Sequence, residues 1–185
     1  MNNGVTTNTL AVCVNGHAAC VRIAGRANFT SSVDFKRVMQ QLQNDGCDEI
    51  VLDLRECRLM DSTFLGVMAG IGSRCEATRQ NGHDCLVELF RPSDRVTELL
   101  DNLGVLDLFK IISEAPPFEC FHPVEDGHAT RSEMARTCYE AHETLRHTNP
   151  DNERRFKDAA DFFAKNLRES ERQGSDEKDS SHGNS

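Results

Sequence analysis

The sequence predicts an α/β fold, a mixed sheet of four to five strands with helices packed on it, followed by a C-terminal α-helical hairpin. Two observations predict this fold. As far as residue 112, short apolar runs alternate with stretches of helical periodicity in the order β-β-α-β-α-β-α-β, which is typical of a sheet covered by helices. Beyond a proline-containing break, two stretches repeat their apolar residues at helical spacing only.

The composition argues against several classes of protein. With 30 acidic and 21 basic residues, the formal charge of −9 disfavours a general nucleic-acid binder, which needs a basic surface. The longest apolar runs, such as 64–72, are far shorter than the ~20 residues of a membrane-spanning helix. No basic cluster precedes an apolar stretch at the N-terminus. We therefore expect no nucleic-acid partner, no membrane insertion and no secretory signal.

The eight cysteines include no C-x-x-C pair, so the sequence shows neither a zinc ribbon nor a thioredoxin motif. Four of them lie in or beside apolar runs, where cysteine behaves as a small apolar residue. These four are Cys13, Cys20, Cys47 and Cys85. Without an export signal, we expect the cysteines to be reduced cytosolic thiols.

The first elements are two strands, 10–14 and 17–24, joined by Asn15-Gly16, whose residues both tolerate the positive φ of a hairpin turn. A helix follows, with Thr30-Ser31-Ser32 as candidate N-caps and Asp34 in capping-box position. Its apolar face consists of Phe35, Val38, Met39 and Leu42.

A buried strand is expected at 48–54 and, after a loop, a helix at 63–79. Gly66, Gly70 and Gly72 each weaken that helix by about 1 kcal/mol relative to alanine. We therefore expect its backbone to lie close to the sheet or to a partner.

The remaining elements of the first domain are a strand at 83–90, a short helix opened by Pro92 and Ser93 and closed by Gly104, and an edge strand at 108–112.

The chain from residue 9 onward divides into four predicted parts. The parts are a domain at 9–113, a linker at 114–128, a helical hairpin at 129–169 and a disordered tail at 170–185, which lacks apolar residues.

Each helix of the hairpin has one apolar face. The faces are Met134, Cys138, Ala141 and Leu145 on the first helix, and Phe156, Ala159, Ala160, Phe163 and Leu167 on the second, which begins at Asn149-Pro150. Because an exposed apolar face is unfavourable in water, we expect the pair to dock on the first domain, or on a second copy of the chain to form a homodimer.

The most informative stretch is Asp61-Ser62-Thr63, where the chain passes from a buried strand and loop into a helix. As a helix N-cap, Ser62 would contribute about 1 kcal/mol by accepting a backbone N–H bond. The same position suits a phosphate, because a helix N-terminus offers free N–H groups and a partial positive charge. The two interpretations are compatible.

Residues 10–112 resemble a STAS domain, the fold shared by sulfate transporters and anti-sigma factor antagonists. The resemblance rests on the element order, on the strand Glu49–Leu54 and above all on Met60-Asp61-Ser62-Thr63-Phe64-Leu65-Gly66, where family members carry a similar Asp-Ser-Ser/Thr-x-Leu-Gly segment. Phe64 departs from the glycine common at its position and puts an apolar ring beside the serine.

The resemblance implies a regulatory switch, not an enzyme, with no cofactor of its own. In antagonists of this family, an anti-sigma factor that is also a protein kinase phosphorylates the serine matching Ser62. The unmodified antagonist binds that kinase and frees a sigma factor, and a protein phosphatase resets the system. The implied protein is a phosphoprotein of the bacterial cytoplasm that regulates transcription, with Ser62 as phosphoacceptor and Thr63 as a weaker second candidate.

The resemblance also points to a surface for the partner around the serine. The expected partner contacts are Asp61, Ser62, Thr63 and Phe64, together with Asn28 and Ser31 in the loop before the first helix. Helix capping explains Ser31 equally well.

Competing sites are weaker. Cys138 and His142 stand four residues apart on a predicted helix, so both could face one metal. Together with Cys120, His122 and His128, however, they lack the compact spacing of a zinc finger. Ser62 lacks the G-x-S-x-G elbow of hydrolases, and no histidine stands in a recognisable sequence relation to it.

We therefore expect no catalytic residue and no bound metal. Two alternatives stay open beside the antagonist. One is a non-switching STAS scaffold in a larger signalling or lipid-transport assembly, and the other is a metal-binding protein that uses the Cys120–His142 cluster.

Overall fold

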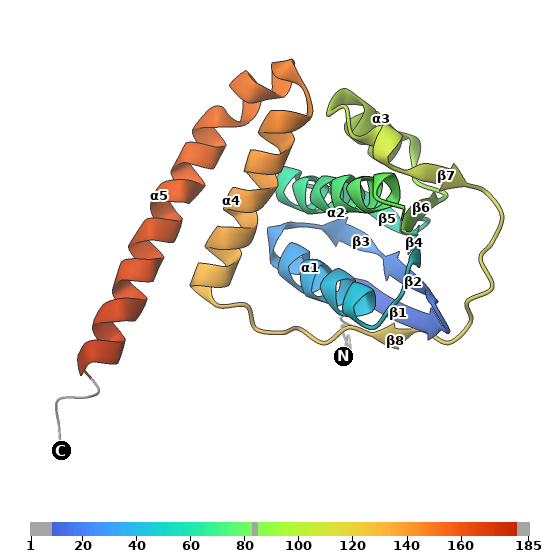
Figure 1. The fold of residues 1–185 in the computed structure, drawn as a ribbon, viewed down its shortest axis with the longest axis horizontal. Helices are drawn as coiled ribbons and strands as arrows, with labels where there is room; N and C mark the ends of the chain where they lie inside the picture. The colour runs from blue at the N-terminus through green and yellow to red at the C-terminus, as the bar shows by residue number, and fades with distance from the viewer. Residues whose placement is uncertain (1–8, 83–84, 181–185) are drawn as a thin grey trace, which may run out of the picture.

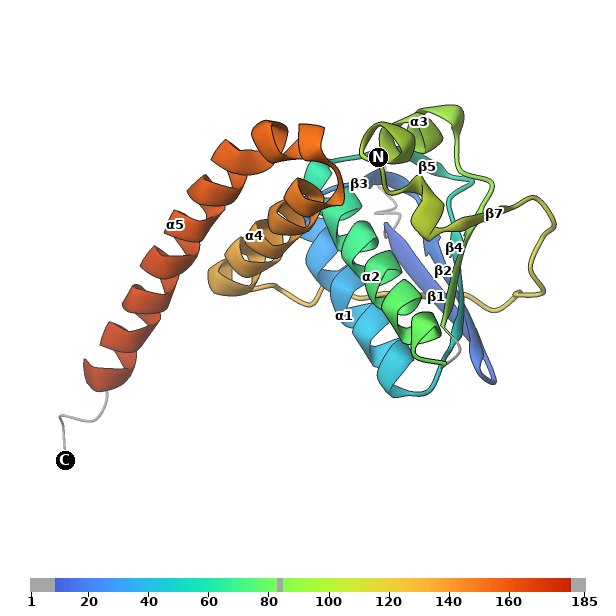
Figure 2. The same cartoon turned by 45° about the horizontal axis from the view of Figure 1, so that its top comes forward.

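The computed structural model describes residues 9–82 and 85–180. A mixed sheet carries helices α1 and α2 on one face, α4 packs on these two helices, and α5 lies outermost beside α4 (Figure 1). The view in Figure 2 shows the same layers from another side and the end of α5 projecting beyond the domain. The expected α/β class with a C-terminal helical hairpin is confirmed.

The main sheet has six strands in the order β7-β6-β4-β2-β1-β8. Strand β1 is antiparallel to β2 and β8, whereas β2, β4, β6 and β7 run parallel to one another. The strands are β1 (Leu10–Asn15), β2 (Ala18–Ile23), β4 (Glu49–Asp53), β6 (Leu86–Phe90), β7 (Lys110–Ile112) and β8 (His122–Pro123).

A second, two-stranded sheet pairs β3 (Gly25–Ala27) with β5 (Cys57–Met60) in parallel. The total exceeds the four to five strands expected. The strands that the pattern missed are short, and β3 and β5 carry exposed arginines, Arg26 and Arg58, that obscure a buried-strand signal.

The helices follow the apolar periodicity of the sequence. They are α1 (Phe29–Asn44), α2 (Ser62–Gln80), α3 (Asp94–Asn102), the short 3-10 turn η1 (Leu106–Leu108), α4 (Arg131–Thr148) and α5 (Pro150–Ser180). Helix α5 thus continues past residue 169, into the stretch whose composition predicted disorder, and residues 181–185 of that predicted tail lie outside the described residues.

The segment expected to be a linker runs along the other face of the sheet. Its residues Phe118 and Phe121 pack against Cys20, Val51 and Phe90. The Arg22 guanidinium lies 3.7 Å from the centroid of the Phe121 ring, and β8 pairs with β1. This segment is therefore a strap that covers apolar surface on the sheet, and it leads the chain across the domain to α4.

Two cysteines depart from the expectation of reduced thiols. Cys75 near the end of α2 and Cys85 before β6 form a disulfide, with Cα atoms 5.0 Å apart. The other six cysteines are free, and of these Cys120 is exposed.

Among the helices that the structure describes, none is both long enough and apolar enough to cross a lipid bilayer.

A buried carboxylate, Asp53, fixes the end of the central strand β4. It is 2% exposed and accepts hydrogen bonds from the Arg55 and Arg22 side chains, at 2.8 and 3.1 Å to Oδ2. Burial raises the pKa of Asp53, but the hydrogen bonds from Arg55 and Arg22 outweigh it and hold the pKa below its ordinary value. The ionised form therefore stabilises the fold.

We expect Asp53→Asn to lower the free energy of unfolding by roughly 1–3 kcal/mol at neutral pH, because the two arginine side chains lose the negative charge of their acceptor and one of its two oxygens. Since the pKa is depressed in the folded state, this stabilisation is present above the unfolded pKa of about 4 and is lost as the pH falls through the folded value. Urea denaturation from pH 7 to pH 3 should show the difference between wild type and variant shrinking below about pH 4. The control is Asp107→Asn at an exposed position, and a difference that is constant over this range contradicts the account.

Candidate functional site

The candidate switch serine, Ser62, is the first residue of α2, and Asp61 caps the helix. Asp61 Oδ1 accepts a hydrogen bond from the Phe64 amide at 2.9 Å, and Oδ2 accepts one from the Phe29 amide at 2.7 Å. The interpretation of Ser62 as N-cap is therefore wrong, since the neighbouring carboxylate, a strong N-cap group, takes that place. One carboxylate thus joins the first turns of α1 and α2 and leaves the Ser62 hydroxyl free of capping.

The Ser62 hydroxyl instead meets a histidine 80 residues further along the chain. Its Oγ lies 3.1 Å from His142 Nε2 on α4, and His142 Nδ1 lies 2.7 Å from the Cys138 carbonyl oxygen. A carbonyl can only accept, so Nδ1 carries the hydrogen. In the neutral ring, Nε2 then accepts the hydrogen of the Ser62 hydroxyl. The ring is 4% exposed, and both of its nitrogens are satisfied.

Thr63, the weaker phosphoacceptor candidate, lies under α4. It is 4% exposed, and its hydroxyl donates to the Cys138 sulfur at 3.8 Å. Phe64 points the other way, into the core, where its fully buried ring stacks on Phe35 with centroids 4.7 Å apart. The Phe64 ring therefore supports α2 from beneath and is not on the surface beside the serine.

Asn28 and Ser31 cap α1 close to the same site. Asn28 is the N-cap; its side chain accepts from the Thr30 and Ser31 amides, and Ser31 Oγ accepts from the Asn28 amide. The expected capping box of Ser31 with Asp34 is therefore displaced by three residues. Since Phe29 is bound to Asp61, these capping groups lie next to the start of α2, on exposed surface.

Helix α4 crosses α2 one turn beyond the serine, at Gly66. A Cβ atom built on Gly66 would lie 2.4 Å from the Ala141 carbonyl oxygen, so the crossing requires a residue without a side chain. Gly72 similarly faces Leu108 and Phe109, at 3.0 Å from each. The expectation that the glycines of this helix permit close backbone approach is thus confirmed for Gly66 and Gly72.

Ion pairs join α4 to α1 on the far side of this crossing. Lys36 pairs with Glu140, and Arg37 pairs with Glu133 at 2.8 Å. The hydrogen bond from Arg37 is the main reason that the pKa of Glu133 falls to about 2. Exposed pairs of this kind contribute little to stability, because water and salt screen them. The pairs therefore fix the direction of α4 more than they hold it in place.

Apolar burial holds the hairpin in place. The residues of α4 that are buried include Cys138, Ala141 and Leu145, and burial of a side chain as large as leucine contributes about 1.5–3 kcal/mol. From α5, Phe156 is buried, and the Phe163 ring lies 5.0 Å from the His142 ring. The hairpin thus docks on the first domain, which is one of the two expected arrangements.

The turn between the two helices anchors on the end of α3. Asn152, buried at the start of α5, donates from Nδ2 to the Leu103 carbonyl at 2.9 Å, and the Thr148 hydroxyl donates to the same oxygen at 3.1 Å. The carbonyl at this helix end would otherwise lack a helical partner. The hairpin therefore contacts α1, α2 and the end of α3.

An open cavity of about 330 Å³ lies where the hairpin meets the serine. Its lining is Phe29, Asp61, Ser62, Thr63, Cys138, His142 and Phe163. Asp61 is the one carboxylate in this lining, which contains no lysine or arginine. Apart from the serine, histidine and carboxylate, the walls are mostly apolar.

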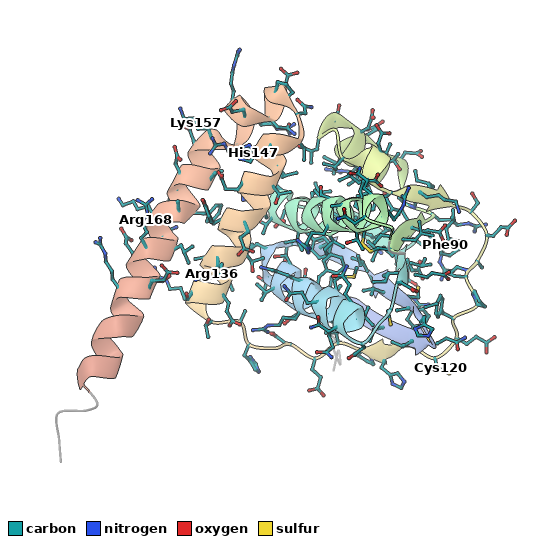
Figure 3. All side chains as sticks on the ribbon, viewed as in Figure 1. Phe90, Cys120, Arg136, His147, Lys157 and Arg168 are labelled. Carbon is teal, nitrogen blue, oxygen red and sulfur yellow. A yellow bond between two sulfur atoms is a disulfide. The ribbon has the colours of Figure 1, made fainter. Side chains whose placement is uncertain are left out.

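His142 was indicated by the sequence only as a possible metal ligand, in an alternative beside the expectation of no bound metal. Its four-residue spacing from Cys138 suggested two metal ligands, but the spacing instead lets the ring bond to the Cys138 carbonyl one turn earlier. Within the described ranges, no three His, Cys, Asp or Glu side chains are grouped to hold a metal ion. Figure 3 also shows Cys120 on the side of the domain away from α4, whereas the labelled Arg136 and His147 lie on α4. The metal-binding alternative therefore has no cluster to support it.

The sequence model of the STAS domain family matches residues 9–115, more than half of the chain. The chain belongs to the STAS domain family. A similar solved structure is the anti-sigma factor antagonist SpoIIAA in its unphosphorylated form, at 15% identity and a TM-score of 0.47, covering 57% of this chain and 89% of that one. Another is a Thermotoga maritima protein proposed to be an anti-sigma factor antagonist, at 21% identity and a TM-score of 0.48, covering 57% and 86%.

The crossing at Gly66 can be tested with two glycines of the same helix. We expect Gly66→Ala to lower the free energy of unfolding by roughly 1–3 kcal/mol, because the new methyl group would overlap the Ala141 backbone. Gly70→Ala is the matched control: its Cβ would lie no nearer than 3.5 Å to its neighbours, and alanine should stabilise the helix by up to about 1 kcal/mol. Urea denaturation of both variants measures the difference, and equal stabilisation by the two would show that α4 does not cross at Gly66.

Proposed function

We propose that this STAS domain is an anti-sigma factor antagonist that acts as a phosphorylation-controlled partner switch. With Ser62 unmodified, it binds an anti-sigma factor that is also a serine kinase; with Ser62 phosphorylated, it releases that partner, and a protein phosphatase restores the first state. It is a binding module and a substrate, not an enzyme, and the ATP and Mg²⁺ belong to the kinase. Its proposed place is the bacterial cytoplasm, in the regulation of transcription.

The observation that carries this proposal is the position of Ser62 at the start of α2, with its hydroxyl unused by the cap. Helix N-termini stabilise phosphate through free amides and the helix dipole, so modification need not unfold the domain. The two solved structures named above are described as antagonists, but the proposal for this chain rests on its own site and its family.

Charge provides the switching step. A phosphate adds roughly −1.5 to −2 charges, directly beside the Asp61 carboxylate. At an interface, an unmatched like charge costs several kcal/mol. A partner that fits the unmodified serine and Asp61 would therefore be released, while the core under Phe64 keeps its packing.

A second candidate is a non-switching STAS scaffold. The observation that favours it is the bond between Ser62 and His142, which turns the hydroxyl toward the chain's own hairpin. In that case the outer surfaces of α4 and α5 would carry the binding, including contact with a second copy of the chain.

The two candidates differ in what the serine does to binding. We expect immobilised full-length Ser62→Ala to retain an ATP-binding serine kinase from lysate of the source cell, and Ser62→Asp to lose it by roughly tenfold or more, since a charge mismatch of a few kcal/mol reaches that range. Quantitative mass spectrometry measures the retained proteins and the phosphate on Ser62 of the wild type.

The matched control for added charge is Ser93→Asp, because Ser93 caps α3 and accepts from the Val96 amide. It should behave as wild type. If all baits retain the same proteins and Ser62 carries no phosphate, the switch is ruled out and the scaffold remains.

A further inference from the structure

The surface around the candidate switch serine is already occupied. Helix α4 places Ala141 on Gly66, Glu140 on Lys36 and His142 on Ser62, all within three consecutive residues. A kinase must reach the Ser62 hydroxyl, and a partner that senses Ser62 must lie on the same face. Ser62 is half-buried and lines an open cavity, but docked α4 restricts the approach of a kinase to its hydroxyl and covers the α1–α2 face beside it.

The side chains that line the cavity beside Ser62 are unsuited to a phosphate, although the N-terminus of α2 favours one when α4 is away. Two walls of the cavity are the aromatic rings of Phe29 and Phe163, and its one fixed charge is the carboxylate of Asp61. A phosphate there would lose hydration without gaining a lysine or arginine, which is costly for a charged group. An esterified Ser62 also has no hydrogen to donate, so it forfeits its bond to His142 Nε2.

We propose that the α4–α5 hairpin is an intramolecular lid on the STAS domain, and that a docked lid excludes both phosphate on Ser62 and a partner on the α1–α2 face. This inference rests on the proposed function, because it assigns a regulator to the same serine. The lid is the chain's own competitor for the binding surface of the switch.

The contacts of the lid also describe the partner that would replace it. The face accepts a helix with a small residue against Gly66 and carboxylates against Lys36 and Arg37. In α4 these are Ala141, Glu140 and Glu133. The partner is therefore a protein that presents a helix with two acidic residues about two turns apart and a small residue beside the second.

The two helices of the hairpin can undock from the domain together. Helix α5 packs mainly on α4, and their pairing includes an ion pair between Arg136 and Glu171 at 2.7 Å. Because lid and ligand compete, each lowers the apparent affinity of the other by the same factor. The apparent affinity of a ligand that binds only the open form is therefore its intrinsic affinity multiplied by the fraction of protein in which the lid is open.

The thiol of Cys138 reports the state of the lid. It is 4% exposed, lies on α4 and faces Thr63, so it becomes accessible only when α4 leaves α2. The experiment uses the full-length chain with phosphoserine incorporated at position 62 by genetic code expansion. Alkylation by N-ethylmaleimide is followed over time, with each cysteine resolved by mass spectrometry.

We expect phosphoserine at 62 to raise the alkylation rate of Cys138 by about tenfold or more relative to the unmodified chain. Phosphoserine at 93, also at a helix N-terminus but away from the hairpin, should leave the rate unchanged. Exposed Cys120 should react rapidly in every sample, and buried Cys57 should stay protected. Loss of protection at Cys57 would identify unfolding instead of lid opening.

A route to the open form that leaves Ser62 unmodified separates the lid from the switch. Ala141→Arg cannot pack against Gly66 but changes nothing on the α1–α2 face, so it should expose Cys138 while Cys57 stays protected. His147→Arg, on the exposed side of α4, is its control. If Ala141→Arg leaves Cys138 protected, the hairpin does not act as a lid.

The phosphoserine result decides the remaining half of the inference. Suppose that Cys138 is equally protected with serine and with phosphoserine at position 62, while the Ala141→Arg variant exposes it. That result would overturn the proposal that the docked lid and the phosphate exclude each other. Because no kinase or partner enters this assay, the inference can fail while the proposed switch stands. Conversely, if Ser62 carries no phosphate in cells, the proposed switch fails, but the alkylation assay still tests whether the hairpin acts as a lid.

Discussion

The arrangement of the site depends on one packing constraint: α4 can cross α2 only where α2 has no side chain. Gly66 supplies that point, one turn after Ser62, and Ala141 supplies the matching small residue on α4. A residue next to a fixed crossing point has little freedom, so His142 must lie over the first turn of α2. The contact between Ser62 and His142 is therefore a consequence of backbone packing, and the ion pairs of Lys36 and Arg37 adjust the direction of the same helix.

A second constraint prepares the domain side of this surface. The two oxygens of Asp61 accept from the first turns of two helices, at Phe64 and at Phe29. The start of α1 is thus held against the start of α2, with the stacked rings of Phe35 and Phe64 beneath. The serine consequently lies on a rigid base, and the movable part of the site is the hairpin above it. This division allows binding to change while the fold is kept.

Local patterns predicted most of the fold. The presence of a hairpin turn after the first strand, the apolar stripe of α1 and the breaks at Gly104 and Pro150 are each decided by neighbouring residues. The expected turn residues Asn15-Gly16 were wrong by one position, because Asn15 pairs with Ala18 and the turn residues are Gly16 and His17. Strands of two to four residues carry too few side chains to show alternation, so β3, β5 and β8 were missed. The cap of α1 was misplaced because several candidate polar residues stand in a row. The helix begins at Phe29, so Asn28 is the cap.

The site was predicted in part, for a related reason. Ser62 and Asp61 belong to one local segment, so the sequence identified them together. His142 lies 80 residues away. The apolar stripe of α4 indicated which face is buried, but no local pattern indicates that this face meets α2 at Ser62. The glycines did indicate close approach, but not its partner. The disulfide between Cys75 and Cys85 likewise depends on how α2 and β6 lie relative to each other, which spacing alone does not specify.

The central claim is that one surface serves both the hairpin and the phosphorylation switch. Amide hydrogen exchange of the full-length chain, with serine or phosphoserine at 62, tests it most directly. The account predicts that phosphoserine removes protection along α4 and the first turns of α5, while α1 and β4 exchange as before. Unchanged protection of α4 would contradict it, because the hairpin would then stay docked while the phosphate is present.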